Sequence, residues 1–323
     1  MTLPWLLHNG FAPDLASAAK LCHAAAMITA PIDDLPPDRP VLLAGPTASG
    51  KSALALALAQ AQNRPIVNAD ALQVYDCWSV LSARPSPQEL SQAEHLLYGH
   101  VPYDVPYSAG HWLRDVAPLL TRTPAPVIIG GTGLYFMALT EGLAEIPATR
   151  PEIRRDASAL LAKSGVGALI AALDADTKAR IDLQNPMRVQ RAYEVLVQTG
   201  RGLARWQDAT PPPLLPPAAA ACWLIGADPA WLNARIDRRF DAMMAAGALE
   251  EARAMLDRWD PARPSSKAIG APELIACLRG EMSESDAIAR AKIASHQYAK
   301  RQRTWFRRRM NGWKLLEPSH TCG

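Results

Sequence analysis

Short apolar runs alternate along this chain with longer segments whose apolar residues recur at helical spacing. Three of the runs, at 41–44, 126–129 and 222–225, are too short for helices, and a fourth begins at Ile66. We predict these runs to be buried strands. Strands separated by helical segments are typical of a parallel sheet with crossover helices. The pattern therefore predicts an α/β fold.

The pattern changes between 148 and 218 to short helices, expected at 151–163, 165–173, 177–181 and 186–198. A proline-rich run at 211–217 closes this segment before the next strand. We predict four parts: a leader at 1–40, the first part of the α/β core at 41–147, an inserted small α-helical domain at 148–218, and the second part of the core at 219–323.

Composition places the chain of 323 residues among globular proteins, with 49% hydrophobic and 20% charged residues. The net charge of +3 is too small to predict a polyanionic partner, so any nucleic-acid signal must be local. No apolar run reaches the roughly 18 residues that span a bilayer. Five scattered cysteines without a CxxC pair favour a reducing compartment and no structural zinc.

The first forty residues carry neither a secretory signal nor an arginine-rich transit peptide. Met27 precedes the first predicted strand by 14 positions. We interpret this leader as an over-called start, with translation beginning at Met27. Recovery of peptides from upstream of Met27 in the natural protein would refute this interpretation.

A glycine-rich loop follows the first strand and leads into a helix, with the sequence GPTASGKS. Strand, G-x-x-x-x-G-K-S and helix together are typical of a P-loop, whose backbone N–H groups surround a diphosphate. The predicted diphosphate-binding residues are Gly45, Thr47, Ala48, Ser49, Gly50, Lys51 and Ser52, where Lys51 supplies a positive charge and Ser52 a hydroxyl for Mg²⁺. A chance glycine-rich turn is disfavoured by this context. The loop does not reveal whether the diphosphate belongs to a nucleotide such as ATP.

Enzymes that hydrolyse ATP usually place a second acid at a strand end to hold the metal. The strand at 126–129 ends instead in Gly-Gly-Thr-Gly, which weakens the motor and kinase interpretations. The first acid after the loop is Asp70, at the end of the strand that begins at Ile66. Because carboxyl ends of parallel strands line one crevice, Asp70 and Thr132 should face the loop. The alternative for Asp70 is a helix N-cap.

Three segments in this order carry a family resemblance: GPTASGKS, VNADALQVY from Val67 and GGTGLYFMAL from Gly130. Together with NPMRVQRAYEV from Asn185, ADPAWLNARIDRRFDAMMAAGALEEA from Ala227, KAIGAPEL from Lys267 and QYAKRQRTWFR from Gln297, they resemble the tRNA dimethylallyltransferases, also called tRNA isopentenyltransferases. The resemblance spans Val41 to about Leu316. It departs from the family pattern at Ala271-Pro272, at Ser82 to Pro85 and at Glu94-His95.

The resemblance implies transfer of the dimethylallyl group of dimethylallyl diphosphate to the exocyclic amine of the adenosine beside the anticodon of tRNA. It also implies a P-loop NTPase-like core with an inserted helical domain and a requirement for Mg²⁺. Asp70 matches the catalytic aspartate of the family and is expected to act as a general base, while Lys51 assists departure of diphosphate. Thr132 matches a family residue near the reacting base.

The resemblance places tRNA contacts in five parts of the chain. They comprise Asp70, Ala71, Leu72 and Gln73; Thr132; Arg154; Met187, Arg188, Val189, Gln190 and Arg191; and Lys300, Arg301, Gln302, Arg303 and Arg307. From the residues alone, Gln73 would be a solvated side chain, the arginines of 186–198 would pair with acids such as Glu194, and the basic C-terminal helix would be a solvated face.

Two other functions stay open from the sequence: a P-loop kinase acting on a small molecule, and a non-catalytic RNA-binding protein. The absence of a C-terminal zinc finger of the eukaryotic type favours a bacterial-type cytoplasmic enzyme. We expect it to act as a monomer.

Overall fold

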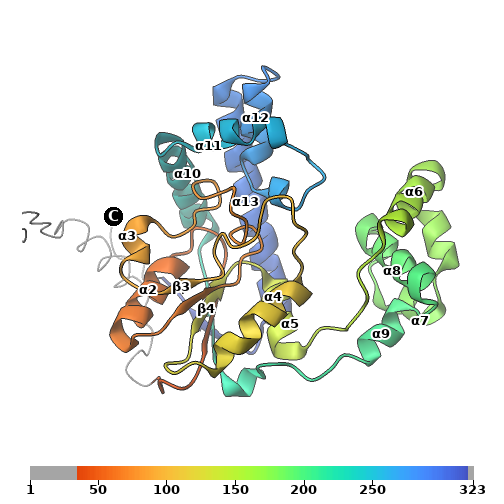
Figure 1. Ribbon diagram of the computed structural model, residues 1–323, viewed down its shortest axis with the longest axis horizontal. Helices are drawn as coiled ribbons and strands as arrows, with labels where there is room; N and C mark the ends of the chain where they lie inside the picture. Colours follow the sequence, from red (N-terminus) through yellow and green to blue (C-terminus); the bar gives the residue numbers. More distant parts are fainter. Residues whose placement is uncertain (1–34, 319–323) are drawn as a thin grey trace, which may run out of the picture. The chain divides into compact units, whose positions relative to one another are not determined.

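The computed structural model describes residues 35–318, and the predicted leader lies almost wholly outside them. Its centre is a sheet of six parallel strands in the order β3-β2-β4-β1-β5-β6 (Figure 1). The strands are β1 (Val41–Ala44), β2 (Ile66–Asn68), β3 (His95–Leu96), β4 (Val127–Gly130), β5 (Ala221–Ile225) and β6 (Lys314–Leu316). The predicted α/β class with a parallel sheet is confirmed.

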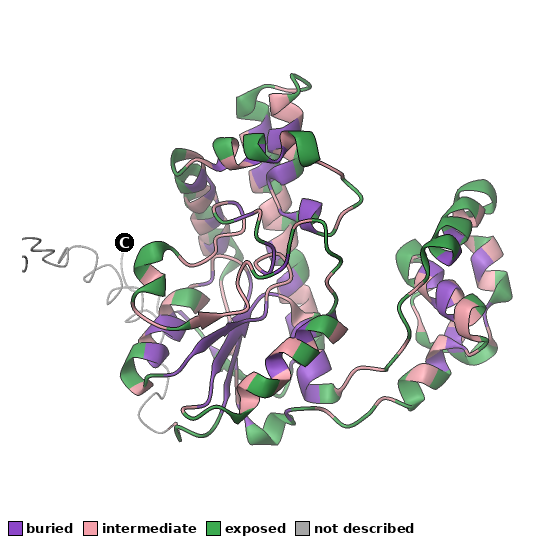
Figure 2. Cartoon of the chain, in the orientation of Figure 1, coloured by how far each residue is buried: buried purple, intermediate pink, exposed green. Residues whose placement is uncertain are grey.

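The side chains of the central strands form much of the hydrophobic core, because these strands are apolar on both faces of the sheet. Val41, Leu42 and Leu43 of β1 are completely buried, and Figure 2 shows the neighbouring strands buried as well. Strand β1 pairs with β4 on one side and with β5 on the other. Near-continuous apolar strands of this kind are expected where helices cover both faces of a parallel sheet. The register aligns Ala44 with Gly130, so the loops after β1 and β4 begin at the same level.

The two edge strands were not predicted. Strand β3 has only two residues and contains His95, and β6 carries Lys314 at an exposed position. Each edge strand pairs with one neighbour only. A strand with so little burial leaves no hydrophobic period to read in the sequence.

The described residues divide into two compact units, one formed by 35–136 and 217–318 and the other by Met137–Pro216. In the first unit the helices are α2 (Lys51–Gln62), α3 (Pro87–Leu90), α4 (Ala109–Val116), α10 (Pro229–Ala245), α11 (Ala248–Ala254), α12 (Ala271–Leu278) and α13 (Glu284–Arg309), with 3₁₀ turns η1 (Ala117–Thr121), η2 (Pro217–Ala219), η3 (Leu256–Arg258) and η4 (Ser265–Lys267). Helix α5 (Gly133–Glu141) contains the division at 136.

The second unit is helical, with α6 (Pro151–Ala172), α7 (Ala175–Arg180), α8 (Pro186–Thr199) and α9 (Leu203–Asp208). Its core contains Leu169, Leu173, Val189 and Ala192. Its bounds of 137 and 216 compare with the predicted 148 and 218. The two helices predicted at 151–163 and 165–173 form one element with a break at Gly165, where φ is 73°. Among the residues described, no helix has both the length and the apolar character needed to cross a bilayer.

Candidate active site

The predicted P-loop connects β1 to α2 and has the backbone of a tight turn. Ala48 has a φ of 60° and Gly50 a φ of 96°, and the N–H of Ser49 donates to the carbonyl of Pro46. Helix α2 begins at Lys51, so the first N–H groups of this helix have no partner within it and point out of its N-terminus. Together with the helix dipole they provide a site for an anion.

Lys51 lies beside this turn, and its Nζ donates to the carbonyl of Pro46 at 2.7 Å. Burial lowers the pKa of Lys51 to about 7; nearby Asp70 opposes this shift and Arg239 adds to it. A diphosphate in the loop would restore the charged form, because an opposite charge nearby favours the ammonium.

Asp70 follows β2 in a loop that is held by hydrogen bonds of its own backbone. Its N–H donates to Asn68 Oδ1 at 2.8 Å, and its Oδ1 accepts from the N–H of Leu72 at 2.9 Å. The carbonyl of Asn68 in turn accepts from the indole of Trp112, which is fully buried. Hence one carboxylate oxygen orients the loop, while Oδ2 is left to act on a ligand.

Thr132 lies in the loop after β4, directly beside the Asp70 loop. The N–H of Ala71 donates to Thr132 Oγ1 at 2.9 Å, and the N–H of Thr132 donates to the carbonyl of Ala69. A Cβ at Gly130 would lie only 2.0 Å from the Ala69 carbonyl oxygen, so glycine is needed for this approach. The structure therefore brings Asp70 and Thr132 together, as the sequence predicts.

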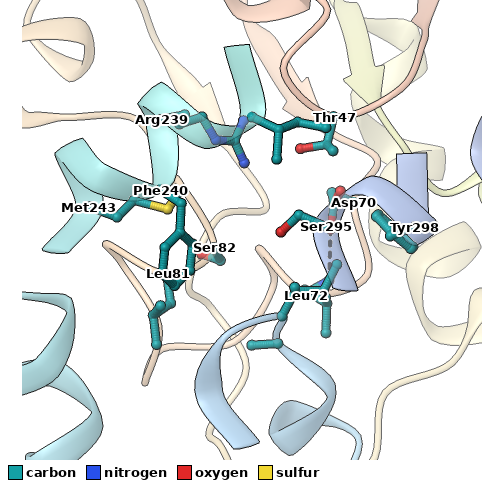
Figure 3. Close-up of a pocket in the computed structure, with 13 residues that line it drawn as sticks. Thr47, Asp70, Leu72, Leu81, Ser82, Arg239, Phe240, Met243, Ser295 and Tyr298 are labelled. Atoms are coloured by element: carbon teal, nitrogen blue, oxygen red, sulfur yellow. Dashed lines mark hydrogen bonds between the residues drawn. The ribbon is translucent and has the colours of Figure 1, made fainter. Parts of the chain in front are cut away.

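A cavity of about 60 Å³ opens between these loops and helices α10 and α13 (Figure 3). Its polar residues include Thr47, Asp70 and Arg239, whereas Leu81, Phe240 and Met243 form an apolar side. Figure 3 shows this apolar side across the cavity from Asp70. The cavity thus joins an anion-binding end to a small hydrophobic end.

Arg239 on α10 is a site residue that the sequence analysis missed. Burial lowers the pKa of its guanidinium, while Asp70 raises it, and arginine remains charged under such conditions. Arg235, one turn earlier, stacks on Trp231 and donates from Nε to the carbonyl of Ala48 in the P-loop at 2.9 Å. Two arginines four positions apart on a helix after β5 are the signal that the sequence offered.

The apolar side of the cavity depends on the loop that carries Leu81. The carboxylate of Glu251 accepts hydrogen bonds from three consecutive N–H groups of this loop, at Ser79, Val80 and Leu81. Gln73 donates from its side-chain amide to the carbonyls of Ser82 and Ala83 at 2.8 and 3.0 Å. Its NH₂ group is thus bound within the protein, which leaves only Oε1 to meet a base edge.

The helical unit presents some of the predicted tRNA contacts and buries others. Met187 is 72% exposed and Arg188 is exposed at the start of α8. Val189 is completely buried in the core of the unit, and Gln190 is 7% exposed with its amide bonded to Ser158 and Glu194. The prediction that Val189 and Gln190 contact RNA is wrong, since α8 turns them inward.

Two of the predicted arginines of this unit converge on one buried acid. Arg154 and Arg191 lie 3.8 and 4.0 Å from the carboxylate of Glu194, and Arg191 also donates to Thr149. This pairing is the alternative that the sequence left open for the arginines. It does not prevent their exposed guanidinium edges from meeting phosphate.

Helix α13 also divides the predicted contacts between two faces. Lys300, Arg301 and Arg307 are exposed, whereas Arg303 is partly buried. Gln302 is 6% exposed, and both ends of its amide are bonded inside the protein. The expected RNA contact by Gln302 is therefore wrong.

The residues at the P-loop are compatible with Mg²⁺ that arrives with a diphosphate. Ser52 is exposed at the start of α2, and Ser49 Oγ is buried without a hydrogen-bond partner among the described residues. Within that part of the chain, His, Cys, Asp and Glu form no cluster that could hold a metal by themselves. Mg²⁺ in phosphate sites commonly takes one or two protein ligands, and the substrate supplies the rest.

Comparison with known proteins identifies the family of the chain. The family profile described as IPP transferase matches residues 73–309, and that described as isopentenyl transferase matches 39–98. The chain belongs to the IPP transferase family. The tRNA dimethylallyltransferase of Cereibacter sphaeroides (strain ATCC 17029 / ATH 2.4.9) is 64% identical over 282 residues, which are 87% of this chain and 90% of the relative. That of Ruegeria sp. (strain TM1040) is 60% identical over 287 residues, which are 89% and 98%.

Solved structures agree with membership of the IPP transferase family. The tRNA isopentenylpyrophosphate transferase of Bacillus halodurans has a TM-score of 0.62 and 28% identity, over 87% of this chain and 90% of that one. A eukaryotic dimethylallyltransferase has a TM-score of 0.73 over 87% of this chain and 74% of that one; at 23% identity it supports the fold. The P-loop-like core expected for this IPP transferase family member is therefore confirmed.

Proposed function

We propose that this protein transfers the dimethylallyl group of dimethylallyl diphosphate to the exocyclic amine of the adenosine adjacent to the anticodon in tRNA, with release of diphosphate. The observation that carries the proposal is one cavity that joins the P-loop to Asp70 and to an apolar side. The family and the named activity of relatives that are 60–64% identical support it.

The leaving group needs positive charge where its negative charge develops. Lys51 and Arg239 provide it, together with the N–H groups at the start of α2. Electrostatic preorganisation of this kind is most effective where water is excluded. The Ser52 hydroxyl would hold Mg²⁺ at this place, and the ion would supply further positive charge to the diphosphate.

The apolar side fits the five-carbon group. Leu81, Phe240 and Met243 offer hydrocarbon and aromatic surface. They carry no charged group that could react with the allylic carbon in place of the amine. As the bond from C1 to the diphosphate oxygen breaks, the electron pair leaves with that oxygen. Exclusion of water from this side protects the reactive carbon from hydrolysis.

Asp70 fits the role of general base at the acceptor. The exocyclic amine forms the new bond to C1 and becomes acidic as it does so, and its proton passes to the free Oδ2 of Asp70. Because Oδ1 is held by the N–H of Leu72, the carboxylate is already oriented. The acceptor base has to leave the stacked anticodon loop to reach Asp70.

The exposed basic residues fit the backbone of the RNA. Arg188 on α8 and Lys300, Arg301 and Arg307 on α13 are free to meet phosphates, which bind Lys and Arg without sequence preference. We expect the protein to act as a monomer in the cytoplasm.

The deciding experiment incubates the protein with labelled dimethylallyl diphosphate, Mg²⁺ and unmodified tRNA. Label is expected in the RNA at the adenosine beside the anticodon, as read by nuclease digestion and chromatography. Turnover of ATP on a metabolite, without an effect of the prenyl donor, would point to a kinase. Binding of tRNA without any modified adenosine would indicate a non-catalytic RNA-binding protein.

A further inference from the structure

Gln302 on α13 connects two loops that are far apart in sequence. Its Oε1 accepts from the N–H of Thr47 in the P-loop at 2.9 Å, and its Nε2 donates to the carbonyl of Gly131 at 3.0 Å. One partner is a donor and the other an acceptor, so the orientation of the amide is fixed. The side chain is 6% exposed, which strengthens both bonds and makes their loss costly.

Gly131 shows how tightly this contact is built. A Cβ at Gly131 would lie 2.2 Å from Gln302 Nε2 and 3.4 Å from Asp70 Oδ2. The amide of Gln302 therefore occupies the space that any larger residue at 131 would need, close to the carboxylate. Residue 131 directly precedes Thr132, whose hydroxyl holds the Asp70 loop.

The same face of α13 continues along the site. Ser295, Tyr298 and Gln302 follow one another at helical spacing, and the first two line the cavity. This face of the helix is thus part of the cavity wall, in contrast to the exposed face that carries Lys300 and Arg301.

We propose that Gln302 is a positioning residue that fixes the P-loop, which holds the leaving group, relative to the Thr132 and Asp70 loops, which hold the acceptor. This inference rests on the proposed function. Prenyl transfer joins two substrates, and each of them is bound by a different loop. A small displacement of one loop against the other lengthens the distance between the reacting atoms, and such misplacement costs up to about a hundredfold in rate.

The first test is Gln302→Leu, which keeps the bulk and removes both hydrogen bonds. We expect kcat to fall about 10- to 100-fold, while the Kd of the anticodon stem-loop and the KM of the prenyl donor each change by less than about threefold. Gln297→Leu is the matched control, because Gln297 is exposed on the same helix. A raised Kd for the stem-loop with unchanged kcat would refute the inference and restore Gln302 as an RNA contact.

The second test, Gln302→Glu, separates positioning from simple loss of packing. A carboxylate can accept from Thr47, but only the protonated acid can also donate to the carbonyl of Gly131. Activity relative to wild type should therefore rise as the pH falls and the introduced carboxylate takes up a proton. A pH profile parallel to that of the wild type would contradict the proposal.

A double-mutant cycle with Gly131 tests the contact itself. Gly131→Ala alone should lower kcat, because the new Cβ displaces Gln302. In a protein that already carries Gln302→Ala, the same change should lower kcat much less, because the space is free. Additive losses would show that the two residues act independently. An inactive wild type would overturn the proposed function, whereas an active wild type matched by Gln302→Leu would overturn this inference alone.

Discussion

The N–H of Ala71 donates to Thr132 Oγ1 at 2.9 Å, so the residue after Asp70 is held by the loop that follows β4. This hydrogen bond joins the ends of two neighbouring strands, β2 and β4. Thr132 thereby acts on the carboxylate through the backbone that carries it. Its hydroxyl can still donate to a ligand, because an accepted hydrogen bond leaves its own proton free.

Thr132→Val tests this link while keeping the shape of the side chain. It leaves the N–H of Ala71 without its partner, which costs about 1–3 kcal/mol. We expect kcat to fall about tenfold or more by that argument, and Thr132→Ser to restore most of it. Steady-state kinetics with an anticodon stem-loop would decide, and equal activity of the valine and serine variants would contradict the role.

Asp70→Asn removes the general base but keeps an oxygen that can accept from the N–H of Leu72. General bases contribute about 10²- to 10⁴-fold to rate. We expect a loss of kcat in that range with little change in affinity for the stem-loop. Single-turnover transfer and a binding titration measure the two quantities, and full retained transfer would exclude Asp70 as the base.

Proton uptake should accompany binding of diphosphate. The pKa of Lys51 is lowered to about 7 in the free protein, chiefly by burial, and an anion in the loop raises it. Below pH 7 the ammonium is already formed and no uptake is expected. Above pH 7 each binding event takes up a proton at Lys51, so affinity falls as the pH rises.

Calorimetry in two buffers of different ionisation enthalpy measures this uptake. Lys51→Arg is the control, because arginine stays charged and the ligand titrates identically in both proteins. The difference between the two proteins should be near zero at pH 6 and approach one proton above pH 8. No difference at the higher pH would show that Lys51 is charged before the ligand binds.

Arg239→Gln should weaken binding of the diphosphate group of the prenyl donor. Hydrogen bonds to charged groups contribute about 1.5–3 kcal/mol, so we expect the KM of the prenyl donor to rise about 10- to 100-fold. Because Arg239 lowers the pKa of Lys51, the variant should also show less proton uptake at pH 8. An unchanged KM would place the diphosphate away from α10.

Arg188→Ala tests the exposed start of α8. The residue forms no ion pair within the described part of the chain, and it is exposed. If it neutralises one phosphate, the slope of log affinity against log salt should fall by about 0.7–0.9. Arg180→Ala in the same unit is the control, because Arg180 is paired with Asp208. Equal slopes for both variants would argue against a phosphate contact at Arg188.

The sequence predicted the parts of the site that lie in continuous motifs. The P-loop, Asp70 and Thr132 stand at the ends of strongly apolar central strands, so parallel pairing alone brings them to one edge. The four central strands and most helices of the insertion were predicted for the same reason, since burial imposes a period on their sequences.

The missing parts depend on contacts between distant segments. Arg239 and Glu251 reach the site from helices that follow β5, far along the chain from the P-loop, and the sequence does not show that these helices pack beside it. The inward turn of Val189 and Gln302 was missed because a motif match assigns a whole segment to one partner, whereas a helix presents each side chain to a different direction.

Three glycines at and after the end of β4 make room for other parts of the chain: Gly130 for the Ala69 carbonyl, Gly131 for Gln302, and Gly133 for the ring of Trp305. Two of these three neighbours come from α13. One face of the last turns of α13 therefore packs into the interior of the protein, whereas the opposite face exposes several arginines. A protein truncated before residue 302 would have cavities beside Thr132. We therefore expect both the rate of transfer and the affinity for RNA to fall.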